Sequence, residues 1–314
     1  MLNSLFKDKN IPDPYYSKSF GSAFLGDSVE VLKKIKGNSI DLILTSPPFP
    51  LKRKKEYGNV SEKEYVNWFL PFAAEFYRIL KDSGSLVIDL GGTYKAGRPI
   101  KSIYQFELLV ALCNDLNFVL AQDLYHYNPA RLPTPAEWVT VRRVRVKDSV
   151  NVVWWLSKTG YPKANNKKVL KPYSPSMKAL LKNGYKPKLR PSGHNISDKF
   201  RNNNNGAIPA NLLVLANTES NSQYLRLCKE ANVKPHPARF PIGFADFFIK
   251  LTTDEMDIII DPFAGSNVTG YAAEVLRRRW IAVELKEEYL IGSQFRFNTS
   301  EVRNLKPKKI LNLF

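Results

Sequence analysis

The sequence predicts an α/β fold in which a mostly parallel sheet is interrupted by a basic lobe. Two observations support this class. Short apolar runs, rich in β-branched residues, alternate with stretches whose apolar residues recur at helical spacing. The alternation stops after residue 157, where basic residues gather, and resumes near residue 236. Strands that alternate with helices form βαβ units, and these units build parallel sheets.

Each expected element has a local signal. The helix at 62–80 follows Ser61, whose hydroxyl could cap it, and prolines set the start of the helix at 236–252. The expected strands lie at 22–26, 41–45, 85–90, 118–127, 150–157, 256–261 and 280–285. The remaining expected helices lie at 28–36, 103–116, 266–279 and 286–296. Trp154 and Trp155, adjacent on one strand, are expected to lie in the core.

The charge of the chain points to a polyanionic partner. Against 29 Asp and Glu there are 47 Lys and Arg, which gives a net charge of +18. Residues 158–201 hold 12 of these cations and one acid, Asp198, and the polar tract RNNNNG follows. A charge run can be only a solvated face. Here, however, it interrupts a fold, and we interpret it as a nucleic-acid-binding lobe.

Membrane and metal partners are not expected. No apolar run approaches the roughly 18 residues that a transmembrane helix needs, and residues 1–18 lack the apolar region of a secretory signal. Cys113 and Cys228 sit apart in helix-like patterns, and the three histidines are scattered. Neither a disulfide framework nor a zinc spacing results. The expectation is a cytoplasmic protein in a reducing compartment.

A candidate cofactor loop lies at 258–274, where an apolar strand ends in Asp261 and a loop of small residues around Gly265 leads into a helix. The free N–H groups of a helix start can meet a ligand there. Glu284 ends the next strand, nineteen residues after Gly265, where a carboxylate can accept both hydroxyls of a ribose. An ordinary βα turn is the alternative. The loop lacks the G-x-G-x-x-G pattern and the P-loop lysine, and a site without a phosphate cradle suits S-adenosylmethionine.

The stretch TSPPF at 45–49 predicts a rigid site for a planar amino group. The amino nitrogen of cytosine or adenine must be held in line with an activated methyl group and its lone pair freed. The Ser46 hydroxyl and the Pro47 carbonyl could accept its two hydrogens. Pro47 and Pro48 stiffen the loop and remove competing donors, and Phe49 could stack on a base taken out of its helix.

These stretches resemble the amino-methylating DNA methyltransferases. TSPPF resembles their catalytic (D/N/S)PP(Y/F) motif, and DPFAGSNVTG at 261–270 resembles their adenosylmethionine motif, with Asn267 where many members carry glycine. The catalytic motif comes first and the basic segment lies between the two, which is the circularly permuted β order. The resemblance covers nearly the whole chain. It implies a Rossmann-like methyltransferase sheet, and Ser46 points to the N4-cytosine branch, since adenine enzymes more often carry Asp.

The resemblance also implies roles for single residues. Asp27 matches an acid that reaches the adenine of the cofactor, and HPARFP at 236–241 resembles a segment over its methionine end. The residues expected to bind S-adenosylmethionine are Asp27, Thr45, Phe240, Asp261, Phe263, Gly265, Ser266, Asn267 and Glu284. The expected catalytic residues are Ser46, Pro47, Pro48, Phe49 and Asp89.

Other assignments rest on position alone. Asp89 ends a strand beside TSPPF, where it could hydrogen-bond Ser46 and help to take up a proton; capping the turn that follows is the alternative. The loop at 128–135 could line the base pocket, or be a plain proline-rich loop. In the basic segment, major-groove and phosphate contacts are expected from a few residues. These are Lys168, Arg190, Ser192, His194 and Arg201.

The expected organisation has four parts: a catalytic half at 1–157, a target-recognition lobe at 158–215, a cofactor-binding half at 216–300 and a basic tail at 301–314. The expected function is methyl transfer from S-adenosylmethionine to N4 of a flipped-out cytosine in a short double-stranded DNA site. The resemblance implies a type II restriction–modification system, with the endonuclease as a functional rather than physical partner. Cysteine-dependent C5 methylation is excluded by the contexts of Cys113 and Cys228. An N6-adenine enzyme, an RNA methyltransferase and a non-catalytic DNA-binding protein stay open.

Overall fold

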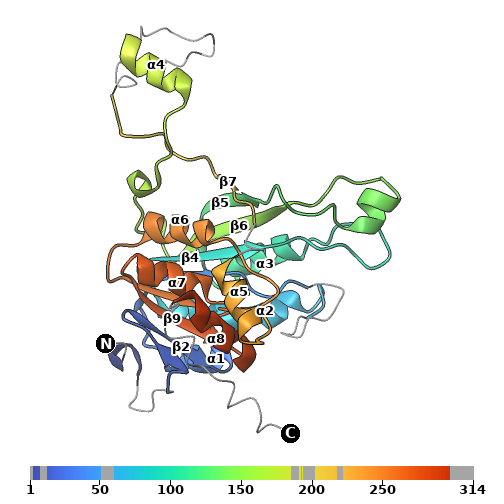
Figure 1. Ribbon diagram of the computed structural model, residues 1–314, viewed down its shortest axis with the longest axis vertical. Helices are drawn as coiled ribbons and strands as arrows, with labels where there is room; N and C mark the ends of the chain where they lie inside the picture. The colour runs from blue at the N-terminus through green and yellow to red at the C-terminus, as the bar shows by residue number, and fades with distance from the viewer. Residues whose placement is uncertain are drawn as a thin grey trace.

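One mixed sheet organises the chain (Figure 1). The computed structural model describes residues 3–7, 13–50, 60–184, 191, 193, 202–217 and 222–297. Among these residues the sheet has nine strands in the order β1-β2-β9-β8-β3-β4-β6-β5-β7. Their bounds are β1 Tyr16–Ser17, β2 Gly21–Leu25, β3 Ile40–Thr45, β4 Leu80–Leu90, β5 Val119–Tyr127, β6 Val150–Ser157, β7 Leu212–Val214, β8 Ile258–Asp261 and β9 Arg279–Glu284.

The strands β2, β9, β8, β3 and β4 are all parallel neighbours, which confirms the α/β class. Strand β6 then pairs antiparallel with both β4 and β5. The carboxyl ends of the parallel strands therefore share one edge of the sheet, and the amino end of β6 lies at the same edge. Both predicted motifs, at the ends of β3 and β8, open onto this edge.

Helices cover both faces of the sheet because its central strands are buried on both sides. On β3, Ile43 points to a core built with α1 (Ser28–Lys34), α2 (Tyr65–Ile79) and α3 (Tyr104–Asn114). Leu42 and Leu44 point to the opposite core, built with α6 (Ile242–Thr252), α7 (Val268–Val275) and α8 (Glu287–Ser293). This alternation is the period-two geometry of a strand. Trp154 and Trp155 are both buried, as expected.

Helix α2 shows where the sequence signals misplaced a boundary. It begins at Tyr65, not at residue 62, and Glu64 is its N-cap residue. The Ser61 hydroxyl does not cap the helix but donates a hydrogen bond to the Glu64 carboxylate. At the other end, α2 passes directly into β4 at Leu80, so that strand starts five residues before the predicted one.

Two helices and one π-helical turn are among the described elements that the sequence expectations lack. Helix α4 (Pro175–Asn183) lies within the basic segment, capped by the Ser174 hydroxyl, and buries none of its residues. Helix α5 (Gln223–Glu230) and the π-helical turn η2 (Glu137–Val141) are the others. Figure 1 shows α4 standing away from the sheet, and its half-exposed apolar residues Met177, Leu180 and Leu181 share one side of the helix.

The basic segment is tied to the sheet on both sides. A bridge between Lys171 and Ala207 closes the excursion that holds α4, and β7 then pairs with β5 at the edge of the sheet. Strand β7 falls inside the range predicted for the lobe, although it belongs to the sheet. The four predicted domain limits stay predictions, and the tail at 301–314 lies outside the described residues. No helix in the described ranges is long and apolar enough to cross a membrane.

Candidate active site

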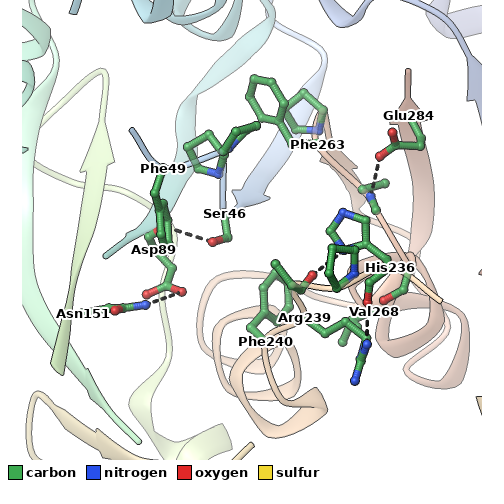
Figure 2. Close-up of a pocket in the computed structure, with 18 of the residues that line it drawn as sticks. Ser46, Phe49, Asp89, Asn151, His236, Arg239, Phe240, Phe263, Val268 and Glu284 are labelled. Carbon is green, nitrogen blue, oxygen red and sulfur yellow. Dashed lines mark hydrogen bonds between the residues drawn. The ribbon is translucent and has the colours of Figure 1, made fainter. Parts of the chain in front are cut away.

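A cavity of about 620 Å³ opens at the carboxyl edge of the parallel strands. Its wall brings together most of the residues that the sequence singled out, from segments far apart in the chain (Figure 2). The predicted residues that line it are Asp27, Ser46, Pro47, Pro48, Phe49, Asp89, Phe240, Phe263, Gly265, Ser266 and Glu284. Catalytic and cofactor motifs therefore face one space, as a transfer reaction requires.

Not every predicted residue reaches the cavity. Thr45, Asp261 and Asn267 are buried behind its wall. Lys168 is engaged elsewhere: its ammonium donates to the main-chain carbonyl of Thr253 at 2.9 Å and pairs with Asp254. The DNA-contact predictions for Arg190, Ser192, His194 and Arg201 lie outside the described residues.

Ser46 stands directly after β3, where the strand delivers it to the cavity. Its hydroxyl donates a hydrogen bond to the main-chain carbonyl of Asp89, 3.1 Å away. That bond occupies the only hydrogen of the hydroxyl, and its lone pairs remain able to accept. Ser46 is thus prepared to accept a hydrogen bond from a ligand N–H.

Phe49 owes its place to a glycine on the neighbouring strand end. The ring packs over Gly91, where an added Cβ would lie 2.5 Å from its Cε2 atom. Any larger residue at 91 would displace the ring. The half-buried ring also packs against the core beneath it, so its position is set before any base arrives.

The Asp89 carboxylate does not bond Ser46, so the side-chain hydrogen bond that the sequence allowed is not formed. Its Oδ2 atom instead accepts a hydrogen bond from the side-chain Nδ2 of Asn151 at 3.2 Å. The Arg131 guanidinium in turn donates to the side-chain Oδ1 of Asn151 at 3.1 Å. The Oδ1 atom has no hydrogen-bond partner in the part of the chain that the structure describes. His126 Nδ1 lies 3.7 Å from it.

His126, Asn151 and Arg131 were not among the predicted site residues. His126 on β5 lies opposite Asn151 on β6, and Asp89 on β4 lies opposite Val153, two residues further along β6. Because side chains alternate along strands, those of His126, Asn151 and Asp89 all lie on one face of the sheet. Each looked isolated in the sequence, and only the strand order β4-β6-β5 reveals the cluster.

The cofactor loop is held by Glu284. Its Oε2 accepts from the Gly265 amide at 2.8 Å and its Oε1 from the Lys286 amide at 2.9 Å. Burial raises the pKa of Glu284 above its ordinary value, and these amides oppose that shift. A carboxylate has about four lone-pair positions, so each oxygen can still accept a ligand hydroxyl.

Gly265 is required by its conformation. Its φ of 51° is left-handed, and an added Cβ would lie 3.0 Å from ring atoms of His236. His236 packs edge-on against Tyr289 with ring centroids 4.5 Å apart, and burial lowers its pKa to about 4. A neutral ring therefore covers the loop.

Asn267 is the N-cap residue of α7, which begins at Val268. Its side-chain oxygen accepts a hydrogen bond from the Gly270 amide.

Asp261 supports the wall from behind. It accepts hydrogen bonds from the hydroxyls of Thr45 at 2.8 Å and Thr269 at 2.7 Å, and from the Phe263 amide at 3.1 Å. Burial raises its pKa to about 6, although these bonds act in the opposite direction. Asp261 therefore joins the end of the catalytic strand to the cofactor loop.

One oxygen of the Asp27 carboxylate is already occupied by hydrogen bonds from the backbone. Its Oδ1 accepts from the Val29 and Glu30 amides at 2.8 and 3.3 Å, which caps α1. Since it lines the cavity as well, the cap fixes a carboxylate at the cavity wall. Within the described ranges, no three or more His, Cys, Asp or Glu side chains gather as metal ligands would.

A second basic segment was missed. Residues 142–147 read RRVRVK, follow η2 and are exposed. Figure 1 shows the connection between β5 and β6 reaching out from the sheet, in a different direction from the α4 lobe. The same connection holds Asn128 and Arg131, which line the cavity, so the loop predicted at 128–135 does reach it.

Comparisons with known proteins agree on one family. A family model described as DNA methylase matches residues 40–294. The chain is 49% identical over 304 residues to the type II methyltransferase M.PvuII of Proteus hauseri, covering 96% of this chain and 90% of that one. It is 27% identical to M.HpaI of Haemophilus parainfluenzae, covering 84% and 70%. The solved structure of a PvuII DNA methyltransferase, described as cytosine-N4-specific, superposes with a TM-score of 0.77 at 42% identity, covering 95% and 94%.

Proposed function

The chain belongs to the DNA methylase family, and we propose that it transfers a methyl group from S-adenosylmethionine to N4 of a cytosine in double-stranded DNA. The observation that carries this proposal is the single cavity lined by both the Ser46–Phe49 motif and the Gly265–Glu284 loop. The relative that shares 42% identity in the solved structure is described as cytosine-N4-specific.

The residues of the cofactor loop fit S-adenosylmethionine. Glu284 offers a buried carboxylate for the ribose hydroxyls, and the absence of a side chain at Gly265 leaves room for the His236 ring that covers the loop. Asp27 and Phe263 line the same cavity. When bound, the cofactor supplies an electrophilic methyl group on a sulfonium.

The opposite part of the wall suits an exocyclic amino group. Ser46 accepts one N–H hydrogen, because its own hydrogen is given to Asp89, and the Pro47 carbonyl accepts the other. Phe49 stacks on the base. A base inside a duplex cannot reach these groups, so the target is taken out of the stack. Fixed positioning of this kind makes the transfer effectively unimolecular.

The basic segments contribute the DNA surface. The lobe that holds α4 and the exposed run at 142–147 project from the sheet in different directions, and Arg and Lys on both neutralise phosphates. Binding that rests on such contacts weakens steeply with salt.

The biological setting follows from the same activity. An enzyme that methylates one short site protects it from an endonuclease of the same specificity, and M.PvuII and M.HpaI are described as type II methyltransferases. The cognate endonuclease is thus a functional partner, and the reaction takes place in the cytoplasm, where the host DNA lies. DNA modified by the chain should resist that endonuclease.

The direct test is product analysis. Purified protein is incubated with S-adenosylmethionine and duplex DNA, and the nucleosides are separated by mass spectrometry. N4-methylcytosine supports the proposal. N6-methyladenine alone would overturn the cytosine assignment, and methylation of structured RNA in preference to duplex DNA would overturn the substrate class. Absence of any methylated nucleoside would favour a non-catalytic DNA-binding protein.

A further inference from the structure

His126 has no assigned role, and it lies in the cavity wall beside Asp89, the residue expected from the sequence to help take up a proton. Each is at least nine-tenths buried, with 6% of His126 and 2% of Asp89 exposed. Yet Asp89 Oδ1 and His126 Nδ1 are without a hydrogen-bond partner among the residues that the structure describes. Unsatisfied buried polar atoms are costly and call for an explanation.

The contact of His126 Nε2 determines which nitrogen of the ring donates and which accepts. Its Nε2 lies 3.3 Å from the main-chain carbonyl of Leu215. A carbonyl only accepts, so Nε2 carries a hydrogen, and in the neutral ring Nδ1 then presents a lone pair. That lone pair faces Asp89 Oδ1 at 3.7 Å. Two acceptors that face each other leave a place for one proton.

We propose that His126 and Asp89 together take up the proton that the target amino nitrogen releases. This inference rests on the proposed function. As the bond from nitrogen to the methyl carbon forms and the bond from sulfur to that carbon breaks, the nitrogen gains a positive charge. It then gives one of the two hydrogens that Ser46 and the Pro47 carbonyl had held to the Asp89 carboxylate, and keeps the electron pair of that N–H bond. His126 Nδ1 shares the proton, and the pair changes from a net charge of −1 to neutral.

The surroundings of His126 support such a role. From β4 it faces the Asp89 carboxylate, from the segment after β5 the Arg131 guanidinium, and from α6 the uncharged ring of Phe244, with ring centroids 5.3 Å apart. Burial lowers the pKa of His126 and so does Arg131, but Asp89 and the Leu215 carbonyl outweigh them and the pKa is raised. The surroundings therefore favour a proton on the ring more than water does.

Asp89 is the direct acceptor and His126 acts through it as a positioning residue. Asn151 holds Oδ2, and this leaves Oδ1 as the carboxylate oxygen that faces His126. The Ser46 hydroxyl is anchored to the same residue through the Asp89 main-chain carbonyl. The acceptor of the N–H hydrogen and the acceptor of the released proton thus belong to one rigid unit.

Nuclear magnetic resonance tests the pair without the reaction. The chain has three histidines, so 13C-labelled histidine gives a simple titration, and the variant His126→Gln identifies the signal. We expect the His126 midpoint above the ordinary value of about 6.5, and a fall below that value in Asp89→Asn, since burial then dominates. A midpoint that is unchanged in Asp89→Asn would overturn the pairing.

The pH profile of a single turnover tests the role. Glutamine at 126 can still donate to Leu215 but cannot hold a proton. We expect the wild-type rate to fall with acidification through the His126 midpoint, as the pair becomes occupied. His126→Gln should be slower by on the order of 100-fold at pH 8 and should lack that decline. An equal loss at every pH, with the decline retained, would mean a structural role only. N4-methylcytosine from the wild type establishes the proposed function separately, so the two failures are distinguishable.

Discussion

The Ser46 hydroxyl donates its hydrogen bond to the main-chain carbonyl of Asp89, 3.1 Å away, and not to the Asp89 carboxylate. Because β3 and β4 are parallel neighbours with Thr45 opposite Ile88, the sheet itself fixes this bond. The hydroxyl is left as an acceptor, and the carboxylate remains available for a separate purpose. The two acceptors of the site are therefore set by backbone register.

The first prediction concerns Ser46→Ala. We expect the single-turnover rate of methyl transfer to fall on the order of 100-fold to 1,000-fold, as when one pre-positioned hydrogen-bonding group is removed from an active site. Binding of S-adenosylmethionine, measured by calorimetric titration, should not change. Ser61→Ala, on the exposed surface before α2, is the control. Full activity in Ser46→Ala would refute the role given to this hydroxyl.

Alanine variants of two glycines with left-handed backbones distinguish the effect of backbone strain from that of a steric clash with His236. Gly265 has φ of 51° and lies against His236, whereas Gly97 has φ of 67° with no atom within 4 Å of an added Cβ. Both alanine variants should lose about 1 kcal/mol of stability from backbone strain. Only Gly265→Ala should weaken the affinity for S-adenosylmethionine, by roughly ten-fold or more. Equal affinity in both variants, measured by titration, would contradict the assigned loop.

Glu284→Gln tests the buried carboxylate of the same loop. Hydrogen bonds to charged groups contribute about 1.5–3 kcal/mol, so we expect an affinity for S-adenosylmethionine weaker by roughly ten-fold to a hundred-fold. The exposed Glu288 on α8 provides a matched control in Glu288→Gln. If both variants bind the cofactor as the wild type does, Glu284 does not hold the ribose.

Asp261 gives stability a pH dependence. Its pKa is raised from 3.8 to about 6 in the folded protein, so its contribution to the free energy of unfolding is complete below pH 4. That contribution is lost as pH rises through 6, by an amount on the order of 3 kcal/mol. Asp261→Asn carries no titrating group. Denaturant unfolding at several pH values should show the difference between wild type and variant shrinking from pH 4 to 7, and parallel curves would contradict the shift.

The exposed run at 142–147 predicts a salt effect. Arg143 and Arg277 are both exposed and both have left-handed backbones, with φ of 54° and 59°. Arg143→Gln should weaken DNA binding and reduce the slope of log affinity against log salt by about 1. Arg277→Gln, which lies in the turn before β9 at the amino edge of the sheet, should leave that slope unchanged. Identical slopes in both variants would remove the run from the DNA surface.

The parts of the site that were predictable are those encoded by neighbours in the sequence. Ser46 and Pro47 form one continuous stretch, Gly265 lies in the loop that follows an apolar strand, and Glu284 ends the next one. For such residues the strand end alone determines the edge of the sheet. The α/β class followed in the same way from local alternation of strands and helices.

The parts that were missed depend on tertiary pairing. His126 and Asn151 join Asp89 only because β6 lies between β4 and β5, an order that no local pattern encodes. Asp261 occupies a position in the predicted motif but turns inward to Thr45 and Thr269, since the space behind the loop is buried. Helix α4 was missed because its nine residues are too few to give a sustained period within a segment rich in Pro, Asn and Lys.

The most direct test of the whole account is single-molecule sequencing of DNA from a host that carries this gene, which reads the methylated motif and the type of modification together. The account predicts N4-methylcytosine at one short motif and no such mark in a host that carries the Ser46→Ala variant. N6-methyladenine at the motif, or an unmodified genome in the presence of the wild-type protein, would contradict it.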